Sequence, residues 1–224
     1  GLALLLLGGG GAYWLANRGG GEQAALPTAA PTAPPTATER EPTNTAEREP
    51  TSTAAPPPPG DPVLLEAFGI AASSIAPPAV DRAGNPIEYK PDYVLDADPA
   101  TAWRSRELAP GETGAGEFLE VVFDRQVTIQ RIGIIPGYAK VDAIDGTDRF
   151  TQNYVIRHIR LEFPDGTKLE YNLESLPELQ MVEVPPIAAE RFRLVVVRAD
   201  PPASADPRRY LAISTLEVFG QEAP

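Results

Sequence analysis

Apolar and polar residues alternate along several short stretches in the second half of the chain. In FLEVVF at 118–123, Leu119, Val121 and Phe123 occupy every second position, which is the pattern of a β-strand with one buried face. RFRLVVV at 191–197 repeats this alternation. Both stretches are rich in β-branched and aromatic residues, which favour strands. The pattern therefore predicts two half-buried strands.

Other apolar stretches extend this pattern over most of the C-terminal part. A Pro-Asp-Gly turn at 164–166 separates two of them and predicts a hairpin. No long segment carries a helical apolar stripe, so we expect an all-β fold, either a β-sandwich or a jelly roll. The further predicted strands are 127–135, 155–163, 168–173 and 211–220.

One charged residue, Arg157, departs from the alternation of its strand. By parity it falls on the face of Val155, Ile159 and Leu161, and Asn153 shares that parity. A charge on an apolar face needs a partner. Two interpretations follow: a buried ion pair between Arg157 and a carboxylate, or an Arg–Asn pair that contacts a sugar or a peptide at the end of the sheet.

Oxygen-bearing side chains gather in the segment that precedes Trp103. Asp96, Asp98 and Thr101 fall within six residues of one another. Asp and Thr side chains bond to nearby backbone amides and so favour tight turns. Hard oxygens at this spacing also suit a structural Ca2+ ion, provided that backbone carbonyls complete the ligand set. Both interpretations, a hydrogen-bonded turn with Trp103 as a core anchor and a calcium site, stay open.

Taken in order, these segments resemble the discoidin superfamily, also called coagulation factor 5/8 type C domains, which are galactose-binding-like jelly rolls. The resemblance runs from about Leu65 to Gly220 and implies a discoidin-like β-sandwich jelly roll. Its landmarks are AASS (71–74), VLDADPATAW (94–103), GEFLEVVF (116–123), IQRIGIIPGY (129–138), FRLVVV (192–197) and AISTLEVFG (212–220).

Within that superfamily the chain is more similar to the bacterial NADase-type glycan-binding domains. Gly137 and Tyr138 follow the second long strand, and Asn153 and Arg157 lie around the start of the next one. The resemblance implies a glycan site that includes Tyr138, Asn153, Arg157 and Tyr210. Tyrosines offer an apolar face with a polar tip, which suits sugar sites. For both tyrosines, packing in the core or at its rim is the alternative.

The same resemblance implies a calcium site formed by Asp96, Asp98 and Thr101. Related domains usually carry a Glu directly after the Ile-Ser pair of the last strand, where it helps to bind the ion. Here that position is Thr215. Glu217 lies two residues further on, displaced by about 6–7 Å along the strand. We therefore expect a structural Ca2+ to be bound weakly.

The N-terminal residues 1–18 predict an apolar membrane-anchor segment, part of a transmembrane helix. Residues 1–16 carry no charge, and Tyr13 and Trp14 stand where interfacial aromatic residues would fall. Sixteen residues are fewer than the roughly 20 that span a bilayer, so we expect the anchor to begin before Gly1. A cleaved signal peptide and a buried apolar terminus are the alternatives.

A linker is predicted for residues 19–62, where Pro, Thr and Ala dominate and large apolar residues are scarce. Pro-rich chains extend by about 3.1 Å per residue, so this segment could reach on the order of 100 Å. Residues 63–224 are enough for one domain with a substantial core. The order of segments predicts a membrane-anchored protein whose C-terminal domain is extracytoplasmic.

The net charge narrows the range of partners. The chain has 31 acidic and 19 basic residues, a formal charge of −12. Residues 18–62 hold six acids and three bases, which leaves 25 and 16, or −9, for residues 63–224. An acidic domain lacks the basic surface of a nucleic-acid-binding protein. The same charge favours a neutral or cationic glycan over a polyanion.

An enzyme is not expected. The chain has no Cys, and its single His, His158, falls on the polar face of a strand, so no nucleophile stands beside a base. We interpret the chain as a membrane-tethered module that binds surface glycan or cell-envelope polysaccharide. The alternative is a protein-binding or structural adhesion or sensor domain of the same fold without sugar binding.

The predicted boundaries can be tested by limited proteolysis. Cleavage should remove residues 19–62 and leave a stable fragment that starts near Val63, because a disordered Pro/Thr-rich segment is open to proteases. Mass spectrometry of the fragment would locate its start. Degradation of the whole chain at one rate would contradict the boundaries.

Overall fold

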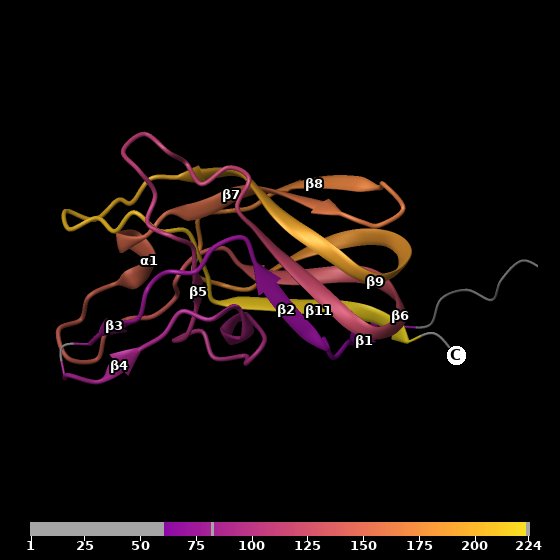
Figure 1. Ribbon diagram of the computed structural model, residues 1–224, viewed down its shortest axis with the longest axis horizontal. Helices are drawn as coiled ribbons and strands as arrows, with labels where there is room; N and C mark the ends of the chain where they lie inside the picture. The colour runs from indigo at the N-terminus through magenta and orange to yellow at the C-terminus, as the bar shows by residue number, and fades with distance from the viewer. Residues whose placement is uncertain (1–60, 82, 223–224) are drawn as a thin grey trace, which may run out of the picture. The chain divides into compact units, whose positions relative to one another are not determined.

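The structure is a computed structural model that describes residues 61–81 and 83–222 (Figure 1). The predicted apolar segment 1–18 and most of the predicted linker, residues 19–60, lie outside the described residues. Within the described ranges, no helix is both long enough and apolar enough to cross a membrane.

The described residues form an all-β domain with two short helical segments, as the alternation of the sequence predicts. The helical segments are the 3-10 helix η1 (Pro91–Val94) and the single turn α1 (Arg149–Gln152). The strands are β1 (Val63–Leu64), β2 (Gly69–Ala72), β3 (Ala79–Val80), β4 (Pro86–Ile87), β5 (Trp103–Arg104), β6 (Phe118–Ile135), β7 (Val155–Glu162), β8 (Lys168–Asn172), β9 (Gln180–Asp200), β10 (Ala212–Ile213) and β11 (Thr215–Glu222).

Seven strands form one hydrogen-bonded sheet, and its two longest strands, β6 and β9, pair with each other at its centre. The order is β1-β11-β6-β9-β7-β8, with β2 also paired to β6. The β6–β9 register shifts between Val122 and Val127. On one side of this break β6 pairs with β2, and on the other side it pairs with β11. The shift therefore divides the sheet into two halves that share β6 and β9.

The two halves bury their inner faces in one core, which makes the domain a β-sandwich. The alternating residues Leu119, Val121 and Phe123 of β6 are all buried, as predicted. Buried residues on the other side of the break belong to the same cluster. These include Ile129, Ile132, Ile134, Val182, Val184, Leu216 and Val218.

The hairpin β7–β8 is formed as predicted, with Leu161 paired to Leu169 across it. Gly166 adopts a φ of 89° in its turn, a conformation that glycine adopts without steric cost. Strand β9, in contrast, begins at Gln180, well before the predicted start at residue 191. The dipeptide at 185–186 is Pro-Pro, and it falls where the β6–β9 register shifts a second time. A bulge is one of the few places where a strand accepts proline.

Trp103 anchors the centre of the core. Its side chain has no exposed surface, and its indole Nε1–H donates to the carbonyl oxygen of Ser74 at 2.9 Å. Buried indoles usually need such an acceptor. The bond ties β5 to the segment that follows β2. The prediction that Trp103 is a core anchor is thus confirmed.

Removal of this side chain should destabilise the domain strongly. We expect Trp103→Ala to lower the free energy of unfolding by about 3–5 kcal/mol, measured by urea denaturation, because it leaves a large cavity. Trp103→Phe keeps most of the apolar volume and should cost less. Phe68→Ala is the matched control, since Phe68 is 78% exposed and its loss should change stability by no more than about 0.5 kcal/mol. A loss below about 1 kcal/mol for Trp103→Ala would show that the ring is dispensable.

Candidate functional site

A polar cavity is lined by residues of β3, β4 and α1, which gather at the end of the domain opposite the end of β11 in Figure 1. Its volume is about 270 Å3. The residues that line it come from the β3–β4 hairpin, β5, the loop after β6, α1 and the loop before β10. They are Ala79, Val80, Asp81, Ile87, Tyr89, Arg104, Tyr138, Lys140, Arg149, Gln152, Asn153, Asp206, Arg208 and Tyr210.

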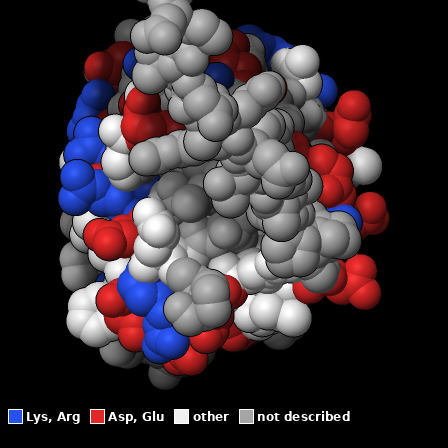
Figure 2. All heavy atoms as spheres, turned by 90° about the vertical axis from the view of Figure 1, so that its right-hand side faces the viewer, with Lys and Arg blue, Asp and Glu red and all other residues white. Residues whose placement is uncertain are grey.

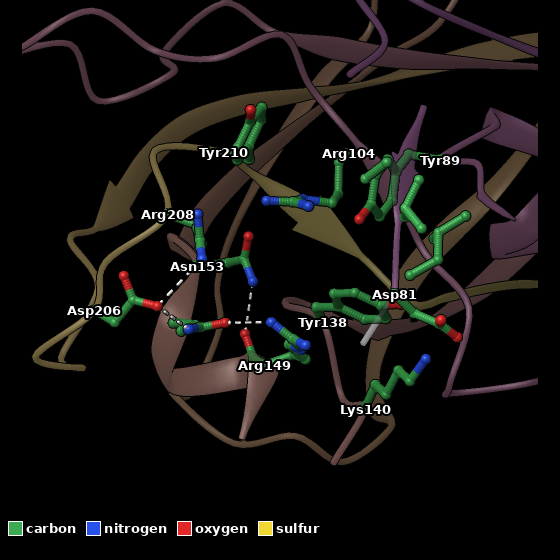
Figure 3. A pocket seen from close by; sticks show the side chains of 14 residues that line it. Asp81, Tyr89, Arg104, Tyr138, Lys140, Arg149, Asn153, Asp206, Arg208 and Tyr210 are labelled. Carbon is green, nitrogen blue, oxygen red and sulfur yellow. Dashed lines mark hydrogen bonds and ion pairs between the residues drawn. The ribbon is translucent and has the colours of Figure 1, made fainter. Parts of the chain in front are cut away.

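Strand β5 places an arginine in this cavity. Its two residues, Trp103 and Arg104, pair with Ile213 and Ala212 of β10. Successive side chains of a strand point to opposite faces. Because Trp103 points into the core, Arg104 points away from it, toward the cavity (Figure 3). The packing of Trp103 in the core therefore also directs Arg104 toward the cavity.

Arg104 lies between two tyrosine rings. Its guanidinium carbon is 3.9 Å from the ring centroid of Tyr210 and 4.5 Å from that of Tyr89, within the range of cation–π attraction. The residue is 8% exposed, and burial lowers the pKa of its guanidinium. Two of its nitrogens, Nε and Nη2, are buried and have no hydrogen-bond partner among the described residues. Buried donors normally have a partner, so these two nitrogens are free to bond with an acceptor that enters the cavity.

Tyr138 lines the inner wall of the cavity. It is only 4% exposed and meets Tyr89 edge to face, with the ring centroids 6.4 Å apart. Burial raises the pKa of the Tyr138 phenol to about 12, so the hydroxyl stays protonated at neutral pH. The preceding Gly137 lets Phe150 of α1 pack closely, since a Cβ at 137 would lie 2.5 Å from the Phe150 ring.

The short helix α1 is fixed at both ends and presents Asn153. Asp148 caps its start by accepting the N–H of Phe150 at 2.9 Å. At its end the side-chain amide of Asn153 donates to the carbonyl of Arg149 at 2.7 Å. The other amide atom, Asn153 Oδ1, is buried without a partner among the described residues. The cavity thus contains an unused acceptor as well as unused donors.

Ion pairs and backbone bonds hold the outer wall. The Arg149 guanidinium donates to Asp142 and to Gln152, both at 2.8 Å. The bond from Arg149 to Asp142 lowers the pKa of the Asp142 carboxyl. Gln152 in turn donates to Asp206 at 3.0 Å, and its carbonyl accepts the N–H of Arg208 at 2.7 Å. The loop at 201–209 is therefore tied to α1 (Figure 3).

The local charge of the cavity is opposite in sign to that of the domain. Four basic side chains, Arg104, Lys140, Arg149 and Arg208, and two acidic ones, Asp81 and Asp206, line it, a formal charge of +2. Residues 63–224 carry −9. The expectation of a neutral or cationic glycan, which rested on the net charge, therefore does not carry over to the chemistry of this cavity.

Residues 71–207 match the family described as the NAD glycohydrolase translocation F5/8 type C domain. The match covers more than half of the chain. The chain belongs to this family. The resemblance to F5/8 type C domains that the sequence suggests is thereby confirmed. No curated protein sequence matches the chain significantly.

Solved structures with a similar fold include carbohydrate-binding modules. CBM32-3 from a family 31 glycoside hydrolase of Clostridium perfringens is 15% identical with a TM-score of 0.50, covering 70% of this chain and 95% of that one. The family 32 module of C. perfringens NanJ, solved with galactose, is 17% identical with a TM-score of 0.45, covering 67% and 92%. At this identity the likeness to CBM32-3 shows the fold alone.

The cavity of this F5/8 type C domain brings together three of the four predicted ligand residues. Tyr138, Asn153 and Tyr210 all line it. Tyr138, however, offers little free ring surface for stacking, because it is almost fully buried. One face of Tyr210 is covered by Arg104. Tyr210 remains partly exposed, so it is the better placed of the two rings to contact a ligand.

Arg157, the fourth predicted residue, does not line this cavity. Its guanidinium pairs with Asp200 at 3.0 Å and donates to the carbonyl of Leu173 at 2.8 Å. The β7–β9 register shifts between Ile156 and His158, which interrupts the alternation used to place Arg157 on the buried face. Arg157 thus forms the ion pair of the first interpretation, but the pair is partly exposed and not buried, with the Asp200 side chain 39% exposed.

Sequence reasoning missed Arg104, the most buried cation of the cavity. A signal was present, since Arg104 directly follows the predicted core anchor Trp103. In a strand the neighbour of a core residue faces the opposite side. The two-residue strand β5 was not predicted, because so short a stretch shows no alternation. Tyr89 and Arg149 were also missed, because Tyr89 lies in an irregular segment and Arg149 in the single turn α1, and neither stretch shows a periodic pattern.

The proposed calcium ligands Asp96, Asp98 and Thr101 lie in a turn closed by its own hydrogen bonds. The Thr101 hydroxyl is 2.8 Å from one Asp96 carboxylate oxygen, and Asp98 accepts the N–H of Ala100 at 2.9 Å. Residues 61–81 and 83–222 contain no group of three or more acidic, His or Cys side chains suited to a metal. These oxygens fit a self-capped turn, and a calcium ion there stays a prediction.

The calcium prediction can be checked by thermal unfolding. With few charged ligands the site should be weak, so Tm in about 1 mM Ca2+ and in EDTA should differ by less than about 4 °C, or about 1 kcal/mol. A tightly bound ion at 100 times its Kd would instead add about 2.7 kcal/mol. If a larger shift appears and Asp96→Asn removes it, the turn binds calcium strongly and this prediction is wrong.

Proposed function

We propose that this F5/8 type C domain is a non-catalytic module that binds a glycan, of the cell surface or the cell envelope, in the cavity around Arg104. The observation that supports the proposal is the set of buried polar atoms left without partners there. Arg104 Nε and Nη2 are donors, and Asn153 Oδ1 is an acceptor. Buried polar groups are costly unless a partner satisfies them.

A sugar has the chemistry that this set requires. Each hydroxyl both donates and accepts, so one sugar ring can serve Asn153 Oδ1 and the Arg104 nitrogens together. The rings of Tyr89 and Tyr210 add apolar surface beside these polar groups, a combination typical of small-molecule sites. The single histidine, His158, pairs with Glu170 at 3.1 Å and does not line the cavity, which agrees with a binding role.

The tether is proposed from the sequence. An apolar segment at 1–18 would hold the chain in a membrane, and the Pro/Thr-rich linker at 19–62 would carry the domain away from it. In this proposal the domain lies on the extracytoplasmic side, where surface glycans or envelope polysaccharides are available.

Glycan binding should depend on Tyr210. We expect Tyr210→Ala to weaken binding by about tenfold, because it removes the exposed ring at the cavity and leaves Arg104 without one of its two tyrosine neighbours. Binding would be measured by titration with the strongest ligands from a glycan array. Tyr93→Ala is the matched control, since Tyr93 is also partly exposed but does not line the cavity.

A folded wild-type domain that binds no glycan on the array would overturn the proposal. It would favour the alternative, a protein-binding or structural adhesion domain of the same fold. Equal losses for Tyr210→Ala and Tyr93→Ala would place the glycan elsewhere on the domain. An unchanged urea midpoint for both variants would show that the comparison concerns binding and not folding.

A further inference from the structure

Building on the proposed function, we infer that the glycan is acidic and that its carboxylate is the counter-ion of Arg104. The inference concerns the ligand class, and it rests on the environment of this one side chain. Arg104 is 8% exposed, and within the described residues no carboxylate forms an ion pair with it. A buried cation without a counter-ion is unfavourable, and an entering anion relieves that cost.

The acidic residues of the cavity are engaged elsewhere. Asp206 accepts from Gln152 at 3.0 Å and from Arg208 at 3.2 Å. Asp81 accepts the backbone N–H of Asn85 at 2.8 Å, within its own turn. Neither carboxylate therefore neutralises Arg104, although both line the same cavity.

One edge of the Arg104 guanidinium has no partner among the described residues. Tyr89 and Tyr210 both contact Arg104 at the distances of cation–π pairs. Nε and Nη2 lie along one edge of the planar guanidinium, and neither ring takes up their N–H groups. A carboxylate is also planar and accepts two parallel bonds from such an edge. The free edge of Arg104 thus suits a carboxylate in particular.

The rest of the cavity suits the body of a sugar acid. Asn153 Oδ1 is an unused acceptor for a hydroxyl, and Tyr138 also lines the cavity. The lining carries +2 in total, which one carboxylate does not exceed. A uronic acid or another carboxylated sugar supplies both the single negative charge and the hydroxyl donors.

The test compares each acidic glycan with its uncharged counterpart on the wild-type domain. The pairs are galacturonate oligosaccharides and their carboxyl-reduced forms, glucuronate oligosaccharides and their carboxyl-reduced forms, and sialyllactose and lactose. At low salt at least one acidic member should bind about tenfold more tightly than its partner, because bonds to charged groups are stronger. The preference should shrink at about 0.5 M salt, which screens charge.

Variants assign the preference to Arg104. Arg104→Gln should abolish the difference between the paired glycans, and Arg104→Lys, which keeps the charge but not the planar edge, should retain part of it. The control is Arg125→Gln, which removes the same charge at the opposite end of the domain. There Arg125 pairs with Asp124 and with Glu222 at the end of β11. Figure 2 views the molecule from the right-hand side of Figure 1, where basic and acidic side chains lie next to one another. The Arg125→Gln variant should bind both members of each glycan pair like the wild type.

The outcomes separate this inference from the proposed function. Equal binding of acidic and reduced glycans by the wild type would overturn the inference and leave glycan binding in place. Binding of no glycan in any pair or on the array would overturn both. If Arg104→Gln fails to fold, Lys140→Gln takes its place, because Lys140 also lines the cavity and its loss should reduce the acidic preference. A full acidic preference in a folded Arg104→Gln domain would also refute the inference.

Discussion

The two-residue strand β5 links the core of this domain to its cavity. Trp103 is fully buried and bonded to the backbone at Ser74, and the alternation of the strand then directs Arg104 the other way. β5 is held in turn by its pairing with β10, and Tyr210 lies just before that strand. The packing of one indole therefore determines where the guanidinium and one of its two tyrosine neighbours stand.

The cavity concentrates unsatisfied polar groups in an otherwise well-paired structure. Most buried polar atoms in folded proteins have partners. Among the described residues four buried side-chain atoms lack one, and three of them, on Arg104 and Asn153, belong to residues of this cavity. Cation–π contacts with two tyrosines offset part of the cost of burying Arg104 but do not neutralise its charge. The unpartnered atoms lower the stability of the free domain, and a ligand whose groups bond to them would raise that stability on binding.

Much of the architecture could be predicted because it depends on local patterns. Strands and turns of this kind depend on residues that are neighbours in the sequence. The strands were therefore recognisable from the alternation at 118–123 and 191–197, and the hairpin from the Asp-Gly turn before Thr167. The predictions failed where pairing is irregular. One register shift lets β6 continue as a single strand where two were predicted, and a second accommodates Pro185 and Pro186 inside β9. A third, in β7, changes the register of Arg157 from the one assumed for it. A bulge is set by the partner strand, which the local sequence does not contain.

The sequence by itself determined the fold class, the family and the net charge of the domain, since these follow from periodicity, the order of short motifs and composition. It also selected Tyr138, Asn153 and Tyr210, which do share a cavity. Only the tertiary structure decided that Arg104 completes the cavity and that its lining is positive in an acidic domain. Those properties arise where loops distant in sequence converge, and a local charge depends on which side chains meet in space and not on their sum along the chain.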